Sequence, residues 1–95
     1  MWYVYMLLCD KNSYYIGITN DLKNRFNQHK NGLTKSTKEF SSIELIYCEK
    51  YLSKNNAARR EKQLKGWSKS KKHMLIEGKL GINSCTEFAE ELLRG

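Results

Sequence analysis

Residues 3–29, YVYMLLCDKNSYYIGITNDLKNRFNQH, decide the fold of this chain. Trp2 to Cys9 carries an aromatic or aliphatic side chain at every position, which is typical of a central strand buried on both faces. Residues 10–13 form a polar turn cluster, and Tyr14 to Thr19 has the pattern of a return strand. The stretch therefore predicts a β-hairpin with a helix directly after it.

The length of the hairpin loop decides which tyrosines share a face of the sheet. With an even number of loop residues, Tyr5 and Tyr15 lie on opposite faces. With an odd number, for example with Cys9 opposite Tyr15, Tyr5 and Tyr15 lie on the same face, together with Gly17 and Thr19. We predict the odd loop.

The predicted helix after the hairpin runs from Leu22 to about Asn31. On a helical wheel, Leu22 and Phe26 form its buried stripe, His29 falls within that stripe and Arg25 lies at its border. Taken singly, Arg25 fits a solvated helix residue and His29 fits a histidine packed in the core. Both side chains nevertheless point toward the predicted sheet.

Ser42 to Tyr51 predicts a third strand, in which Ile43, Leu45 and Tyr47 share one face. Helices are expected over about residues 53–65, then in a short segment that ends at Glu77, and last in an acidic tail. In the short segment, Met74 and Leu75 are predicted to pack inward.

One carboxylate breaks the apolar pattern of the helix over residues 53–65. Glu61 lies between Ala57 and Ala58 on the wheel, inside the apolar stripe. A carboxylate that faces the core is costly unless it pairs with a cation or binds a metal. An ion pair with Arg25 or Lys65 is the structural interpretation, and a metal ligand is the functional one.

A basic patch with an aromatic side chain at its centre, Trp67, follows this helix. Its lysines are Lys62, Lys65, Lys69, Lys71 and Lys72. Such a patch can hold a nucleic-acid backbone or stack a base, although a core tryptophan among solvated lysines fits the pattern as well. Lys35, in the polar segment 32–41, can contact a phosphate too, and a simple connection is an equal reading of that segment.

Composition sets the class of protein. The chain has 95 residues and no proline, which fits one domain, and its formal net charge of +7 favours a polyanionic partner, although a merely well-solvated surface can carry the same charge. Its three cysteines share no C-x-x-C spacing, so they predict neither a disulfide framework nor a zinc site and fit a reducing cytosol. The apolar opening Met1 to Cys9 is too short for a signal peptide or a membrane span, so we expect a cytoplasmic protein without a membrane segment.

Four motifs follow one another on the predicted strand, strand, helix and helix. They are Tyr3-Val4-Tyr5, Tyr15-Ile16-Gly17, Arg25 with His29, and Arg60-Glu61-Lys62-Gln63-Leu64-Lys65. In this order and spacing they resemble the GIY-YIG nuclease superfamily, specifically its small stand-alone members, over about residues 1–77. The resemblance implies an α+β fold with a small three-stranded antiparallel sheet flanked by helices. We expect this domain over residues 1–80, followed by an acidic helical tail over residues 81–95.

The resemblance also implies an activity, the hydrolysis of DNA phosphodiester bonds with one divalent metal, Mg²⁺ or Mn²⁺. By the same resemblance Glu61 is the metal ligand, Arg25 binds the scissile phosphate, Tyr5 and Tyr15 activate and position the water, and His29 assists proton transfer. Because a phenol is a poor base at its ordinary pKa of about 10, Tyr5 needs nearby cations to favour its phenolate, and Arg25, Lys65 and the metal can supply them.

Alternatives to a DNA endonuclease stay open from the sequence. A non-catalytic nucleic-acid-binding module of the same fold would use the lysines around Trp67, and a covalent phosphotyrosine link through Tyr5 or Tyr15 is a third reading. The residues do not distinguish DNA from RNA, and a protein partner could supply specificity. Two positions depart from the family pattern: Tyr3 replaces its first glycine, and His73 stands where larger members have an asparagine.

Overall fold

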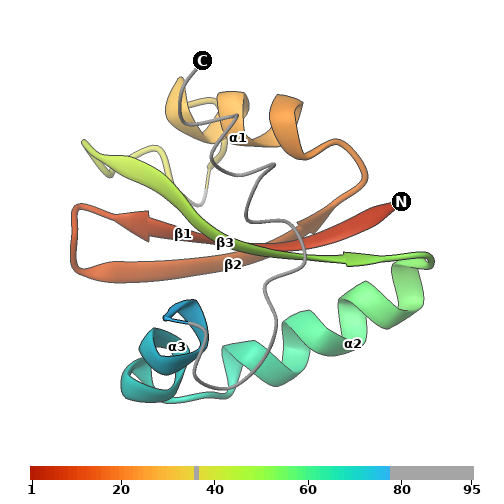
Figure 1. The fold of residues 1–95 in the computed structure, drawn as a ribbon. Helices are drawn as coiled ribbons and strands as arrows, with labels where there is room; N and C mark the ends of the chain where they lie inside the picture. The colour runs from red at the N-terminus through yellow and green to blue at the C-terminus, as the bar shows by residue number, and fades with distance from the viewer. Residues whose placement is uncertain (36, 78–95) are drawn as a thin grey trace.

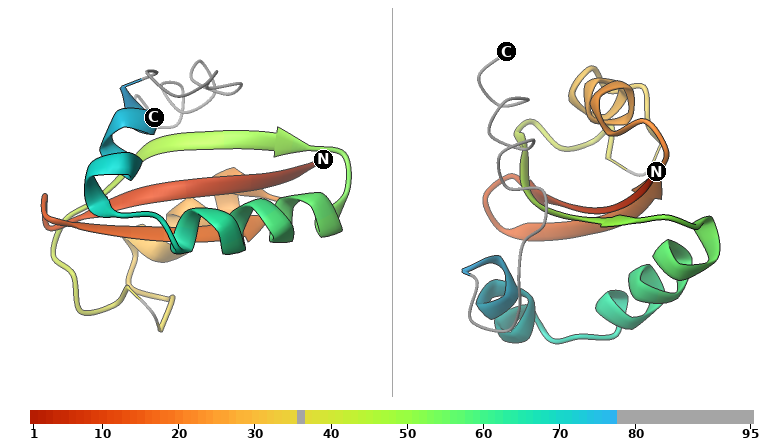
Figure 2. Two further views of the ribbon diagram at one scale, coloured as in Figure 1. Left: turned by 90° about the horizontal axis from the view of Figure 1, so that it is seen from below. Right: turned by 45° about the vertical axis from the view of Figure 1, so that its right-hand side comes forward.

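The computed structural model describes residues 1–35 and 37–77. Its elements are β1 (Trp2–Cys9), β2 (Ser13–Thr19), α1 (Leu22–Lys30), β3 (Ile43–Tyr51), α2 (Lys54–Lys65) and α3 (Lys69–Ile76). The strands form one antiparallel sheet in the order β2-β1-β3. Figure 1 shows α1 over one face of the sheet and α2 with α3 over the other, and the turned views of Figure 2 agree. The predicted three-stranded α+β architecture is confirmed. The predictions for the acidic tail and for Cys85 fall outside the described residues, whereas Cys9 is a buried free thiol.

The central strand β1 is buried on both faces, as its unbroken apolar run predicted. Tyr5, Leu7 and Cys9 pack with α1 in one core cluster, whereas Val4 and Met6 pack with α2 and α3 in a second cluster. All five side chains are at most 2% exposed. The two core clusters therefore lie on opposite faces of the sheet, and β1 contributes side chains to both.

The hairpin loop has three residues, Asp10 to Asn12, so its odd length is confirmed. Tyr5 pairs with Gly17 and Leu7 with Tyr15, which puts both tyrosines on the α1 face. Our example register was wrong, because Cys9 lies opposite Ser13 rather than opposite Tyr15. Positive φ angles of 52° and 60° at Asp10 and Lys11 make a tight turn. Ser13, which the sequence placed in the turn, is therefore the first residue of β2.

A bulge in β3 overturns the predicted alternation of that strand. The pairing with β1 shifts between Met6 and Leu7, where Tyr47 and Leu45 are the partners and Ile46 is left between them. Leu45 therefore packs in the α1 core and Tyr47 in the α2 core, although the simple two-residue period places both on one face. The extra residue reverses the face for the second half of the strand.

Each helix begins at a side-chain cap. Asp21, Ser53 and Ser68 accept hydrogen bonds from backbone N–H groups in the first turns of α1, α2 and α3. In α3, Leu75 is buried as predicted, but the prediction for Met74 is wrong: it is 40% exposed, and Ile76 packs against the second core cluster with Leu75.

A buried carboxylate ties α2 to the sheet. Glu49 on β3 accepts hydrogen bonds from the hydroxyls of Tyr47 and Tyr51 and from Arg60 of α2, at 3.0 Å from Nε and 3.1 Å from Nη2. Burial works to raise the pKa of Glu49, but the hydrogen bonds from Arg60 and the two tyrosines outweigh it and hold the pKa below its usual value. The carboxylate is therefore ionised at neutral pH and fully hydrogen-bonded.

We expect Arg60→Met to lower the free energy of unfolding by about 3 kcal/mol, because it leaves the Glu49 charge buried without its cation. Methionine keeps much of the aliphatic bulk that packs beside Trp67. Urea unfolding at pH 7 measures the change, and Arg59→Met on the exposed neighbour is the matched control, expected within about 0.5 kcal/mol of the wild type. Equal stabilities of the two variants would contradict this role for the Glu49–Arg60 pair.

The pair also makes the stability of the fold depend on pH. Because the pKa of Glu49 is depressed, the contribution of its carboxylate to the free energy of unfolding is present at neutral pH and is lost as the pH falls through the folded-state pKa, below 4.5.

Candidate functional site

Three rings from three elements meet beneath α1. Tyr5 Oη and His29 Nε2 are hydrogen-bonded at 2.8 Å, and the two rings meet edge to face at 5.6 Å between centroids. Tyr15 lies 6.2 Å from the Tyr5 ring and 5.0 Å from the His29 ring. The structure thus brings together Tyr5, Tyr15 and His29, which the sequence singled out on two strands and a helix.

Gly17 gives the Tyr5 ring its place in the sheet. A Cβ atom at Gly17 would lie 2.6 Å from Tyr5 Oη and 2.7 Å from Cζ, distances that real side chains do not adopt. The phenol therefore lies across the backbone of the neighbouring strand β2, an edge strand of the sheet. The glycine of the Tyr15-Ile16-Gly17 motif is required by this close approach rather than by an unusual backbone angle.

Two charged residues act on the Tyr5 hydroxyl from opposite sides of the sheet. The Arg25 guanidinium on α1 lowers the pKa of Tyr5, and the Glu61 carboxylate on α2 raises it. Burial is the largest influence, followed by Tyr15, and the net pKa is well above the ordinary value of a phenol. Arg25 thus acts on the phenol in the direction expected of a nearby cation, but in the protein alone desolvation outweighs it.

His29 is fully buried and neutral. Burial, and then the nearby Arg25, lower its pKa to about 4. At pH 7 the imidazole is therefore uncharged and has one nitrogen that can accept a hydrogen bond. Arg25 itself is exposed at the surface of α1, so it is accessible to a phosphate.

Glu61 is only partly buried, in contrast to the core-facing position that the helical wheel predicted. Its side chain is 23% exposed, whereas Ala57 and Leu64 on the same helix are fully buried. Lys65 Nζ lies 3.6 Å from its carboxylate, a distance that fits a loose surface pair. The carboxylate therefore lies at the border of the buried stripe and is accessible to solvent.

The donor set around Glu61 fits a hard cation that keeps most of its water ligands. Among residues 1–35 and 37–77, no three His, Cys, Asp or Glu side chains gather as a metal cluster. Mg²⁺ is commonly held by one or two carboxylates together with waters and substrate phosphate oxygens. The single accessible carboxylate of Glu61 is compatible with that habit, and with Mn²⁺ as well.

Thr37 joins this cluster, and the sequence analysis did not single it out. Its hydroxyl Oγ1 lies 2.7 Å from His29 Nδ1, and the residue is fully buried. Thr37 belongs to the polar segment between α1 and β3, where no hydrophobic period marks one residue as buried. Only the folding of that segment back onto α1 reveals the contact.

The predicted nucleic-acid-binding lysines divide between two parts of the molecule. Those of the patch lie on the side of α2 and α3, whereas Lys35 lies in the segment that joins α1 to β3. Trp67 is half-buried against the α2 core, with Arg60 and Lys71 over its ring at 5.1 and 4.2 Å from the centroid. Lys69 donates a hydrogen bond to the side chain of Asn12. Lys62, Lys65 and Lys71 are exposed, while Lys72 is partly buried.

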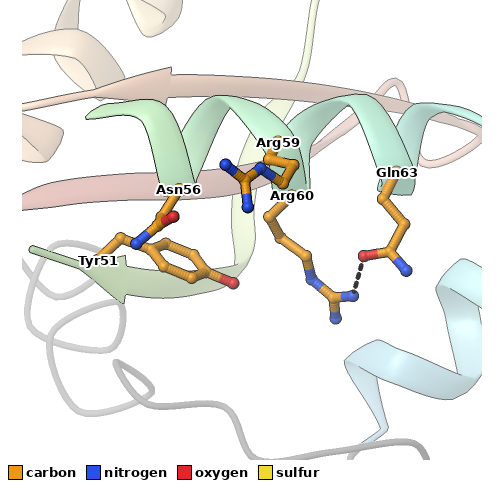
Figure 3. Close-up of a pocket in the computed structure, with 5 residues that line it drawn as sticks. All are labelled: Tyr51, Asn56, Arg59, Arg60 and Gln63. Atoms are coloured by element: carbon orange, nitrogen blue, oxygen red, sulfur yellow. Dashed lines mark hydrogen bonds between the residues drawn. The ribbon is translucent and has the colours of Figure 1, made fainter. Parts of the chain in front are cut away.

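A cavity of about 410 Å³ opens on the α2 side of the sheet, apart from the three-ring cluster. Its lining residues are Tyr51, Asn56, Arg59, Arg60 and Gln63, which project from the end of β3 and from one side of α2 (Figure 3). Arg60 donates hydrogen bonds to Glu49 and to Gln63, and Glu49 balances its charge. Arg59 is the other cationic side chain that lines the cavity. None of the predicted catalytic residues lines this cavity.

His73, which replaces the asparagine of larger family members, lies on the surface of α3. Its Nε2 is 2.9 Å from the Glu77 carboxylate, and its Nδ1 is 3.4 Å from Tyr14 Oη. These contacts orient an exposed imidazole beside the basic patch and do not reach the three-ring cluster. No helix of residues 1–35 and 37–77 is long and apolar enough to cross a membrane.

Comparison with known proteins agrees with this arrangement. The model of the GIY-YIG catalytic domain matches residues 1–74. The chain is 38% identical over 76 residues to a UPF0213 protein of Bacillus pumilus, covering 79% of this chain and 78% of that one. It is also 37% identical over 78 residues to the UPF0213 protein YazA of Bacillus subtilis, covering 81% and 79% of the two chains.

A solved structure extends the comparison to three dimensions. The solution NMR structure of the UPF0213 protein BH0048 from Bacillus halodurans superposes with a TM-score of 0.53 at 34% sequence identity, over 81% of this chain and 84% of that one. The family model, the relatives and the shared fold all point the same way as the order of the four motifs: this chain belongs to the GIY-YIG family.

Proposed function

We propose that this protein is a Mg²⁺-dependent endonuclease that hydrolyses phosphodiester bonds in DNA. One observation carries the proposal: the hydroxyl of Tyr5 is bonded to a neutral histidine while Arg25 and Glu61 act on it from opposite sides of the sheet. A phosphodiester hydrolase needs a cation for the phosphate, an aligned water and an acceptor for its proton. Membership of the GIY-YIG family supports nucleic acid as the substrate class.

In the proposed reaction, a water attacks phosphorus and gives its proton to Tyr5 Oη, while the P–O bond opposite the water breaks and the departing ester oxygen takes a proton from solvent. As the phenol takes up that proton, it passes its own to His29 Nε2 through the 2.8 Å hydrogen bond. This relay needs no free phenolate, which the raised pKa of Tyr5 disfavours. The negative charge of a bound phosphate would favour the imidazolium that forms at His29.

The remaining groups of the proposed site bind and orient the substrate. Arg25 is exposed and can bind the scissile phosphate through paired hydrogen bonds. Tyr15 borders both rings of the relay and positions the water beside Tyr5. Glu61 would hold the divalent cation, which when bound neutralises charge on the phosphate oxygens.

The proposal also covers specificity, the type of nucleic acid, the location of the protein and the bounds of the nuclease domain. Specificity is proposed to come from a protein partner or from the structure of the nucleic acid. RNA is the alternative substrate, and a cytoplasmic location is proposed. Residues 1–80 are proposed as the nuclease domain, with residues 81–95 as its tail.

A second candidate function is a nucleic-acid-binding module without catalysis. The observation that favours it is the set of exposed lysines on α2 and α3, around a tryptophan that already holds two cations over its ring. Such a surface binds phosphates whether or not a water can be activated nearby.

We expect Glu61→Gln to abolish Mg²⁺-dependent cleavage of plasmid, branched or single-stranded DNA while leaving DNA binding intact. The amide keeps the shape of the side chain but removes the charge that holds the cation. Gel assays of cleavage with and without Mg²⁺, beside fluorescence anisotropy for binding, measure the two effects. Equal cleavage by the wild type and the variant would sink the proposed role and point to a contaminating nuclease, and binding by both without any cleavage would favour the second function.

We expect Gly17→Ala to reduce the cleavage rate by about 10²-fold in a folded protein, because the new methyl group displaces the Tyr5 hydroxyl from its place. Gly66→Ala is the matched control. A Cβ atom there would lie 3.5 Å from the nearest atom, an ordinary contact, and cleavage should stay at the level of the wild type. Circular dichroism checks the fold of both variants. A fully active Gly17→Ala protein would show that the position of the phenol is not important.

We expect the double variant Lys62→Gln, Lys72→Gln to weaken DNA binding uniformly across sequences and to reduce the slope of log K against log salt by about 2. Lys38→Gln, an exposed lysine outside the patch, is the charge control. Anisotropy titrations at several salt concentrations measure the slopes. An unchanged slope for the double variant would exclude these lysines from the interface.

A further inference from the structure

Thr37 is held firmly against the far side of His29. Its backbone N–H donates to the carbonyl of Thr34 at 3.1 Å, and its carbonyl accepts from the N–H of Phe40 at 3.1 Å. Phe40 in turn packs against the α1 core. The hydroxyl of Thr37 is therefore anchored 2.7 Å from His29 Nδ1, in a position without exposure to solvent.

Two arrangements of hydrogens satisfy the row of hydroxyl, imidazole and hydroxyl. In the first, Tyr5 donates to Nε2 of His29, and Nδ1–H donates to Thr37. In the second, Thr37 donates to Nδ1, and Nε2–H donates to Tyr5. Only the first leaves Nε2 as an acceptor of the Tyr5 proton.

The chemistry of the two hydroxyls favours the first arrangement. In solution a phenol has a pKa of about 10, whereas the acidity of an alkyl hydroxyl is close to that of water at about 15.7, so the phenol is the stronger hydrogen-bond donor. Burial disfavours the anion of both hydroxyls and so keeps this order. The phenol oxygen is also the poorer acceptor, because one of its lone pairs is delocalised into the ring. Both differences direct the Tyr5 hydrogen toward Nε2 and the Nδ1 hydrogen toward Thr37.

We propose that Thr37 is the positioning residue that holds His29 in its Nδ1–H tautomer, with Nε2 open to the Tyr5 hydroxyl. Its effect on cleavage rests on the proposed function, whereas the tautomer itself does not. The polar segment between α1 and β3 thereby gains a role in the site. A single buried hydroxyl sets the direction in which the proton moves.

Nitrogen-15 NMR of the intact chain tests the tautomer directly. The sequence has two histidines, so a His73→Gln sample assigns the His29 signals. At pH 7 we expect Nδ1 of His29 to resonate as a protonated, pyrrole-type nitrogen and Nε2 as an unprotonated one. The opposite pattern in the wild type overturns the proposal without any variant.

Variants separate the influence of Thr37 from that of Tyr5. Thr37→Val keeps the shape of the side chain but removes the acceptor, so the His29 proton should move to Nε2, where Tyr5 Oη accepts it. Thr37→Ser should keep the Nδ1–H tautomer, and Tyr5→Phe should keep it too, because Thr37 still accepts. An Nδ1–H tautomer that persists in Thr37→Val, or is lost in Tyr5→Phe, contradicts the assignment.

Cleavage rates complete the test. Thr37→Val should be slowed by about tenfold or more with little change in KM, and Thr37→Ser should restore most of the rate. Full activity in a Thr37→Val protein whose tautomer has changed would refute the positioning role. Failure of the proposed nuclease function gives a different result. Glu61→Gln would then cleave as well as the wild type, while the NMR result on the His29 tautomer would be unchanged.

Discussion

The burial of β1 on both faces is the constraint on which the rest of the structure depends. A strand whose alternate side chains all need cover must have a layer on each side, and this chain supplies α1 on one and α2 with α3 on the other. Tyr5 belongs to that strand, so its phenol is placed in the α1 core by the same packing that stabilises the fold. Its hydroxyl is then buried and must find a partner, and His29 is that partner.

The three rings of the candidate site lie on the α1 face of the sheet, against its edge strand. β2 is an edge strand, and at Gly17 it carries no side chain, so the Tyr5 ring can lie across it. Beside the dominant effect of burial, Arg25 of the α1 layer lowers the pKa of this phenol and Glu61 of the α2 layer raises it. Charges from separate helices thus converge on one hydroxyl without forming an ion pair that would neutralise them both.

A contrast with Glu49 clarifies why Glu61 is the better candidate for a functional carboxylate. Glu49 is surrounded by hydrogen-bond donors and has its charge matched by Arg60, so it is satisfied within the fold. Glu61 has one loose contact with Lys65 and is partly exposed. The structure therefore uses one carboxylate to stabilise the packing of α2 and leaves the other accessible for a cation.

The sequence by itself determined the elements, their order and the identity of the motif residues, because hydrophobic period, capping residues and glycines are local signals. The odd length of the hairpin loop was also predicted from the sequence, because only an odd loop places Tyr5 and Tyr15 on the same face of the sheet. Tertiary structure alone decided the bulge at Ile46, the degree to which Glu61 is exposed, and the contact of Thr37 with His29. All three features depend on contacts between segments that are distant in the chain. The pattern of residues within one segment carries no information about such contacts. The raised pKa of Tyr5 belongs to the same class, because desolvation is a property of the packed protein and not of the residue.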